Sequence, residues 1–109
     1  MSGKPYEFVF DERLGVLRPL LHVDYESMTE SQQQDFELGC QEVLAAIPEK
    51  IRDWETEYLH RFEQLQTAED DRDFVRLSEE LNRISSILSD LNLLYLHIEG
   101  NYLGANVTA

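Results

Sequence analysis

The stretch from Phe74 to Ile98, FVRLSEELNRISSILSDLNLLYLHI, decides the fold of this chain. Apolar side chains recur in it at alternating intervals of three and four residues, which places them on one side of an α-helix. They are Phe74, Leu77, Leu81, Ile84, Leu88, Leu91, Tyr95 and Ile98. The opposite side carries charged residues: Arg76, Glu79, Arg83 and Asp90. The pattern predicts a long C-terminal helix over 72–99, a stop at Gly100 and a tail, 100–109.

The end of this helix is apolar on more than one side. Leu93, Leu94 and Leu96 join the seam there, and a helix that is apolar nearly all round must be covered by more than one neighbour. We expect the cover to come from the N-terminal segment or from a second copy of the chain. A homodimer formed in this way would use Leu94, Leu96 and Ile98 as its contacts.

A second long helix is predicted over residues 30–66. Two capping-box patterns, Ser27-x-x-Glu30 and Thr29-x-x-Gln32, place its start near residue 30. Its apolar side runs through Phe36, Cys40, Val43, Ile47, Ile51, Trp54, Tyr58, Phe62 and Leu65. Pro48 lies inside this stripe, and because proline removes one helical hydrogen bond, we expect a kink there or a break into two helices.

The remaining segments complete a single domain over 1–109. The polar turn TAEDDRD, 67–73, is short, so the two helices should be antiparallel neighbours. Tyr6, Phe8 and Phe10 alternate with other residues in the period of a strand, and a second extended run follows DERLG, which predicts a β-hairpin over 6–25. The expected fold is mainly α: an antiparallel helical bundle with an N-terminal β-hairpin.

The charge balance limits the classes of partner. The chain has 22 acidic and 9 basic residues and a formal net charge of −13. Binding to nucleic acid needs clustered lysine and arginine, and anionic membranes attract the same basic clusters, so we expect neither partner. The sequence has no long apolar run, no signal-peptide pattern and a single cysteine, which favours a cytoplasmic protein.

The acidic residues concentrate in one part of the sequence. Between Asp24 and Glu49 there are seven carboxylates and no lysine or arginine. A solvated helix usually intersperses bases to form i,i+4 pairs, so an alternative to simple solvation is a surface that docks a basic protein. The candidate partner-binding residues are Asp24, Glu26, Glu30, Asp35, Glu37, Glu42, Glu49, Asp53 and Glu57.

Catalytic patterns are weak. Glu57-x-x-His60 has the spacing used in dimetal helical bundles, but the helix periodicity turns His60 away from the apolar seam. Cys40 is in phase with the seam and surrounded by acids, which favours a core residue over a nucleophile. We therefore expect no cofactor, no bound metal and no enzymatic activity.

Three functional hypotheses follow. The first is a non-enzymatic interaction protein, such as a regulator, adaptor, immunity protein or antitoxin-like inhibitor, that docks its acidic helix onto a basic protein surface. The second is a phage-type inhibitor whose carboxylates imitate the phosphates of a nucleic acid. The third is a metal-dependent helical-bundle enzyme.

Overall fold

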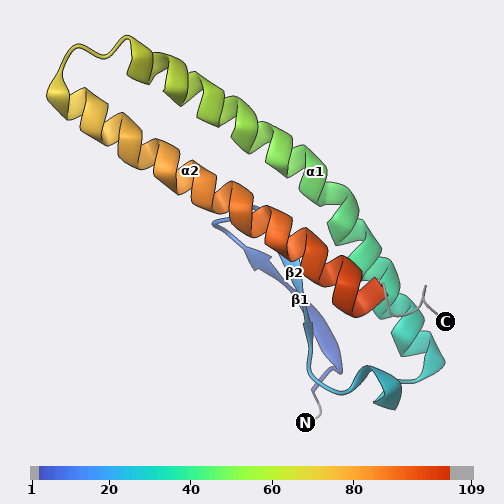
Figure 1. Cartoon of the computed structure of the whole chain (residues 1–109). Helices are drawn as coiled ribbons and strands as arrows, with labels where there is room; N and C mark the ends of the chain where they lie inside the picture. The colour runs from blue at the N-terminus through green and yellow to red at the C-terminus, as the bar shows by residue number, and fades with distance from the viewer. Residues whose placement is uncertain (1–2, 104–109) are drawn as a thin grey trace.

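The fold is an antiparallel pair of long helices with a β-hairpin packed on one face, as the sequence predicts (Figure 1). The computed structural model describes residues 3–103. Its elements are the strands β1 (Tyr6–Asp11) and β2 (Val16–Leu21), a short 3-10 turn η1 (Tyr25–Ser27), the helices α1 (Glu30–Gln66) and α2 (Asp71–Ile98), and a π-helical turn η2 (Glu99–Leu103).

Helix α1 begins where the capping box predicts. The Thr29 hydroxyl accepts from the Gln32 backbone N–H, and the Gln32 side chain accepts from the Thr29 N–H. The helix then runs through Pro48 without interruption. Pro48 is exposed, so the ring meets solvent rather than a packed neighbour, and the Leu44 carbonyl that loses its helical donor can be hydrated. The alternative of two helices broken at Pro48 is therefore wrong.

Helix α2 begins at Asp71, where the Asp70 side chain caps the first turn by accepting from the Arg72 N–H. The predicted stop at Gly100 is wrong, because the chain continues from α2 into η2. Tyr102 and Leu103 in this turn pack against the core, so residues 100–103 belong to the folded body. The remainder of the predicted tail, 104–109, lies outside the described residues.

The β-hairpin is shorter than predicted. β1 and β2 pair antiparallel with Phe8 opposite Pro19, and β2 ends at Leu21 rather than near residue 25. Asp11 organises the turn: its carbonyl accepts from the Gly15 N–H and its carboxylate accepts from the Leu14 N–H. Gly15 has φ 79°, a conformation that glycine adopts without a steric penalty.

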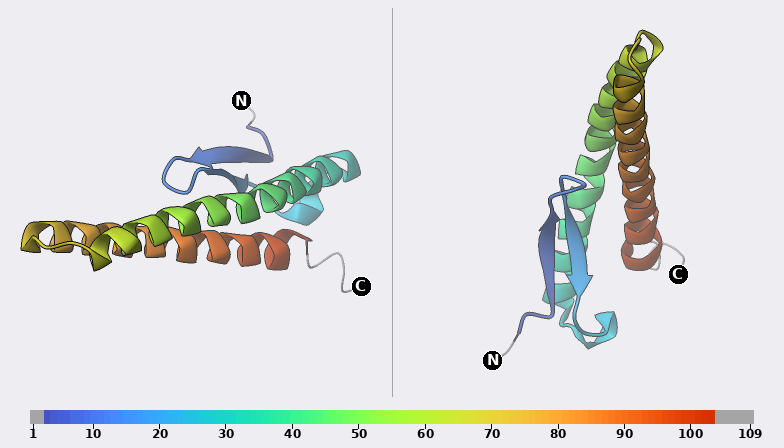
Figure 2. Two further views of the ribbon diagram at one scale, coloured as in Figure 1. Left: turned by 90° about the horizontal axis from the view of Figure 1, so that it is seen from above. Right: turned by 90° about the vertical axis from the view of Figure 1, so that its left-hand side faces the viewer.

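The hairpin covers one side of the helix pair and leaves the other side open (Figure 2). It packs mainly on the first half of α1, where Phe8 lies so close to Gly39 that a Cβ on that glycine would come within 2.4 Å of the Phe8 ring. Its turn reaches α2, since Arg13 hydrogen-bonds to Ser86 and Asp90. The distal part of both helices extends beyond the hairpin.

The buried face of α2 is wider than the predicted seam. Leu77, Leu81, Ile84, Leu91 and Ile98 are buried as predicted. The hairpin side of the helix adds two further buried residues, which are Ile87 and Leu94. On the other edge Leu88 and Tyr95 are only half-buried, and Phe74 is 51% exposed. The shift follows from the hairpin, which covers one edge of the seam and not the other.

The predicted dimer contacts need a correction. Leu94 and Ile98 are buried in the core of the single chain, so they are not available to a second copy in this fold. Leu96 is 62% exposed. The apolar surface expected near the end of α2 is thus partly consumed by the hairpin and by η2, and Leu93 and Leu96 stay on the surface.

The hairpin turn should give the fold an acid-sensitive contact. The pKa of Asp11 lies below its usual 3.8, chiefly because the carboxylate accepts a hydrogen bond from the Leu14 N–H. Partial burial raises this pKa, and the hydrogen bond and charge of Arg18 lower it. A carboxyl group whose pKa is lowered by folding stabilises the folded state at pH values above its unfolded-state pKa. This stabilisation is lost as the pH falls through the folded-state pKa. We expect Asp11→Asn to cost about 1 kcal/mol at neutral pH and to lose this difference as the pH falls through the lowered folded-state pKa of Asp11. Urea titrations across the acid range measure it.

The matched control for this test is Glu12→Gln, which removes the exposed neighbouring carboxylate in the same turn. It should leave the acid limb of the stability curve unchanged. An equal change in both variants would contradict the role assigned to Asp11.

Candidate interaction surface

The nine candidate acids do not share one surface. Asp24 and Glu26 lie at the η1 turn, ahead of α1. At 3.6 residues per turn, Glu30 and Glu37 project from one flank of α1. The opposite flank carries Asp35, Glu42, Glu49 and Asp53, which lie within roughly 40° of one another around the helix axis.

Two of the nine acids are engaged within the chain. The Tyr25 hydroxyl donates to the Glu37 carboxylate, and Arg61 pairs with Glu57 at 3.2 Å, one turn further along α1. These two carboxylates therefore have local structural roles: Glu37 holds η1 against the start of α1, and Glu57 joins the arginine that also binds Glu80 of α2 at 2.7 Å.

We call Asp35, Glu42, Glu49 and Asp53 the acidic flank. All four are exposed, and within residues 3–103 none of them forms an ion pair with a lysine or an arginine. The first three are spaced by seven residues, or about 10 Å along the helix. The flank is therefore a straight row of unneutralised charges on a rigid element.

The acidic flank borders the hairpin. Glu42 and Lys50 stand at the edge of an open groove of about 520 Å³ between the hairpin and α1, floored by Val43 and Ala46 and walled by aromatic residues of β1. Lys50 lies against Gly15 and does not reach a carboxylate of the flank within the ion-pair distance. A partner on the flank thus meets a mixed surface, acidic along α1 and apolar toward the hairpin.

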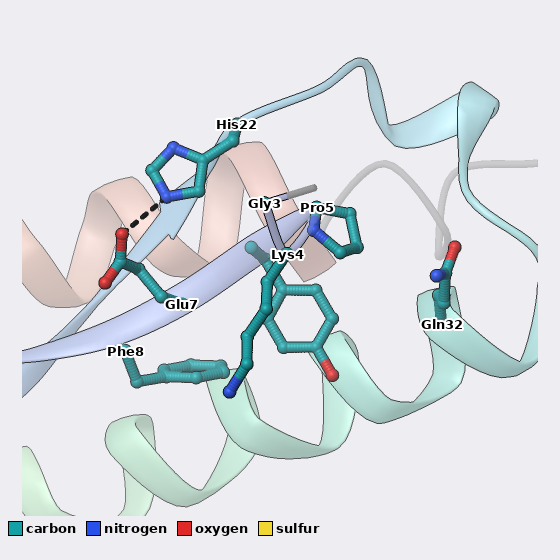
Figure 3. Close-up of a pocket in the computed structure, with 8 residues that line it drawn as sticks. Gly3, Lys4, Pro5, Glu7, Phe8, His22 and Gln32 are labelled. Carbon is teal, nitrogen blue, oxygen red and sulfur yellow. Dashed lines mark hydrogen bonds and ion pairs between the residues drawn. The ribbon is translucent and has the colours of Figure 1, made fainter. Parts of the chain in front are cut away.

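A hollow lies beside the start of β1 (Figure 3). It is open, about 840 Å³ in volume, and is lined by residues of the N-terminal segment together with His22 and Gln32. His22 Nε2 lies 2.7 Å from a Glu7 carboxylate oxygen, across the two strands. Both side chains of this pair are exposed, and Figure 3 shows them at the side of the hollow.

Cys40 is a core residue, as the sequence predicts. It has no exposed surface, and burial, reinforced by the charge of Glu37, raises the pKa of its thiol to about 12. Since the thiolate is the reactive form, the side chain stays protonated and inert near neutral pH.

The Glu57-x-x-His60 pattern does not converge on a metal site. Glu57 pairs with Arg61, and His60 is exposed. In the described part of the chain, no three histidine, cysteine or acidic side chains come together as metal ligands would. The geometry gives no support to the dimetal hypothesis.

Comparison with known proteins gives no family to which the chain can be assigned: no family model, no curated protein and no solved structure matches it. Across residues 3–103, no helix is both long and apolar enough to cross a lipid bilayer.

The sequence located the acidic helix but did not divide its carboxylates correctly into surfaces. The seven-residue spacing of Asp35, Glu42 and Glu49 was visible, and projecting α1 on a helical wheel would have separated them from Glu30 and Glu37. The partners of Glu37 and Glu57 could be identified only in the folded structure. The partner of Glu37 is Tyr25 of η1, and the pairing of Glu57 depends on the direction in which the Arg61 side chain points.

Proposed function

We propose that this protein is a non-enzymatic interaction or regulatory protein that docks the acidic flank of α1 onto a basic surface of a partner protein. The observation that supports it is the row of four exposed carboxylates that form no ion pair with a lysine or an arginine of residues 3–103. When two proteins carry rows of opposite charge that face each other, the attraction speeds their encounter and sets their relative orientation. The partner's complementary feature would be lysine or arginine at about 10 Å intervals, as on one side of a helix with a base every seven residues.

The spacing favours a protein partner over nucleic-acid mimicry. Duplex DNA carries a phosphate about every 3.4 Å of axis on each strand, whereas carboxylates of the acidic flank repeat about every 10 Å. A mimic of a phosphate backbone needs a denser row than this one. Competition with a DNA duplex for the captured partner distinguishes the two, because a mimic is displaced by DNA and an adaptor is not.

Charge reversal tests the proposal. The flank variant replaces Asp35, Glu42, Glu49 and Asp53 with lysine, and quantitative affinity capture from the native host compares it with the wild type at low and high salt. We expect the flank variant to lose about tenfold or more in capture of the salt-sensitive partner, since rim charges act mainly on association. Circular dichroism should show unchanged helicity.

A matched control makes the same charge change elsewhere. Replacing Glu26, Glu30, Glu55 and Glu63 with lysine alters four exposed acids that lie outside the acidic flank. We expect this variant to retain the partner. An equal loss in both variants would show that only net charge matters, and retention by both would show that the flank is simply solvated.

A further inference from the structure

The side of the helix pair opposite the hairpin carries an apolar strip that no other segment within residues 3–103 covers. Its residues repeat every seven positions on both helices. On α1 they are Leu44, Ile51 and Tyr58, and on α2 they are Leu81, Leu88 and Tyr95. We call these six residues the open face.

The open face points away from the hairpin. Leu44 stands two residues from Ala46, which lines the groove under the hairpin. Leu88 stands two residues from Asp90, which Arg13 of the hairpin turn holds at 2.7 Å. Two positions along a helix are about 160° apart around its axis, so Leu44 and Leu88 lie on the uncovered side.

Burial agrees with this placement for five of the six residues. Leu81 is 7% exposed, while the other five residues of the open face are only half-buried although they adjoin the core. Aromatic surface continues the strip toward the distal end, where Phe62 is 40% exposed and stacks on Tyr58. Such a continuous apolar strip is typical of an interaction site on a soluble protein.

The electrostatic setting of the open face suits a second copy of this chain. A net charge of −13 makes self-association unfavourable wherever carboxylates would meet. The α2 edge of the open face is uncharged along most of its length, at Ser78, Ser85 and Asn92, and carries one charge, Glu99, at its end. On the α1 edge, Gln41 and Pro48 are uncharged and Glu55 carries the charge. The acidic flank lies on the other side of α1, away from this contact.

The heptad spacing is also self-complementary. Phe36 contacts Tyr102, with ring centroids 5.2 Å apart, and Arg61 donates a hydrogen bond to Glu80. These two contacts fix the register of the antiparallel helices. In this register Ile51 lies level with Leu88. A two-fold axis at that level makes Ile51 and Leu88 meet their own copies. It sets Leu44 opposite Tyr58, and Leu81 opposite Tyr95, of the second chain.

We propose that the protein is a homodimer in which two open faces pack against each other, with the helix pairs antiparallel, to form a four-helix bundle. The open face extends over fourteen residues, or about 21 Å, on each helix, and at a width of two helices it covers roughly 400 Å² on each copy. This is about half of the roughly 800 Å² per partner of a standard interface and lies in the range of weak, reversible complexes. This dimer is independent of the proposed acidic docking and would present two acidic flanks at its surface.

Charge at the distal turn selects the antiparallel orientation. Glu69, Asp70, Asp71 and Asp73 cluster where α1 turns into α2. Parallel packing would bring two such clusters within the range of about 10 Å over which exposed charges repel. Antiparallel packing separates them by most of the length of the bundle.

Sedimentation equilibrium across the micromolar range tests the dimer. The expected mass is twice the chain mass of 12.8 kDa. Ile51→Glu combined with Leu88→Glu should weaken dimerisation about tenfold or more, because like charges meet on the two-fold axis. Since those positions are half-buried, a second variant, Ser85→Glu with Asn92→Glu, introduces the repulsion at exposed positions where it does not disturb the fold.

The control is Leu38→Glu with Leu93→Glu, which adds the same charge at exposed leucines outside the open face. It should leave the dimer intact. A single-chain mass at every concentration overturns the proposal, as does a dimer that the control breaks and the two open-face variants do not.

Orientation is measured with a spin label on Glu69→Cys, because the native Cys40 is buried and does not compete for the label. Antiparallel packing predicts a distance of about 50 Å between the two labels. A distance of roughly 20 Å or less, as neighbouring helix ends would give, overturns the antiparallel arrangement.

Discussion

Phe36→Ala should remove about 3–5 kcal/mol of the free energy of unfolding, the usual cost of truncating a buried phenylalanine. Phe36 has no exposed surface. Its ring centroid lies 5.2 Å from Tyr6, 5.9 Å from Phe8 and 5.2 Å from Tyr102. One side chain of α1 therefore joins the first strand and the final turn, and its loss takes a large share of a total stability of about 5–15 kcal/mol.

Urea denaturation of the wild type and of Phe36→Ala measures this cost. Phe62→Ala is the control, since this ring is 40% exposed and stacks only on Tyr58 among the described aromatic side chains. It should cost about 1–2 kcal/mol. If the two variants lost similar stability, Phe36 would not be the junction between the hairpin, α1 and η2.

Leu14→Ala should cost about 2–5 kcal/mol, although Leu14 lies in the hairpin turn. The side chain has no exposed surface and belongs to the main core cluster. A two-stranded hairpin is marginal in water and depends on what it packs against. We therefore expect the variant to loosen the whole hairpin from the helices and not only the turn.

Amide hydrogen exchange gives the specific test, because undocking should accelerate exchange in β1 and β2 more than in the centre of α1. Leu20→Ala removes the same atoms from the hairpin at a position that is 42% exposed, and it should cost less than half as much. Exchange that increases equally in all elements, or similar costs for the two variants, would contradict an anchoring role for Leu14.

The helices were predictable because their signals are local. The capping box at Thr29, the seam of α2 and the polar turn between the helices each involve residues close in sequence. The prediction failed where two elements compete. Gly100 reads as a stop, yet packing of Tyr102 beside Phe36 carries the chain into η2.

The candidate surfaces were predictable only in part. The sequence showed that α1 is acidic and that the end of α2 has too much apolar surface for one partner. Which leucines remain available depended on the position of the hairpin, which buries Leu94 and leaves Leu93 and Leu96 exposed. No local pattern specifies that position, because it follows from contacts such as Phe8 on Gly39 and Arg13 on Asp90.

Helix periodicity, caps and charge content were thus determined by the sequence itself, since backbone hydrogen bonds and side-chain spacing within an element depend on neighbours a few residues away. Only the tertiary structure decided that Pro48 stays within one helix, that the turn residue Leu14 is a core residue, and that the hairpin covers one face of the helix pair and not the other. These outcomes depend on burial between segments distant in sequence, where the free energy of covering apolar surface outweighs local preference.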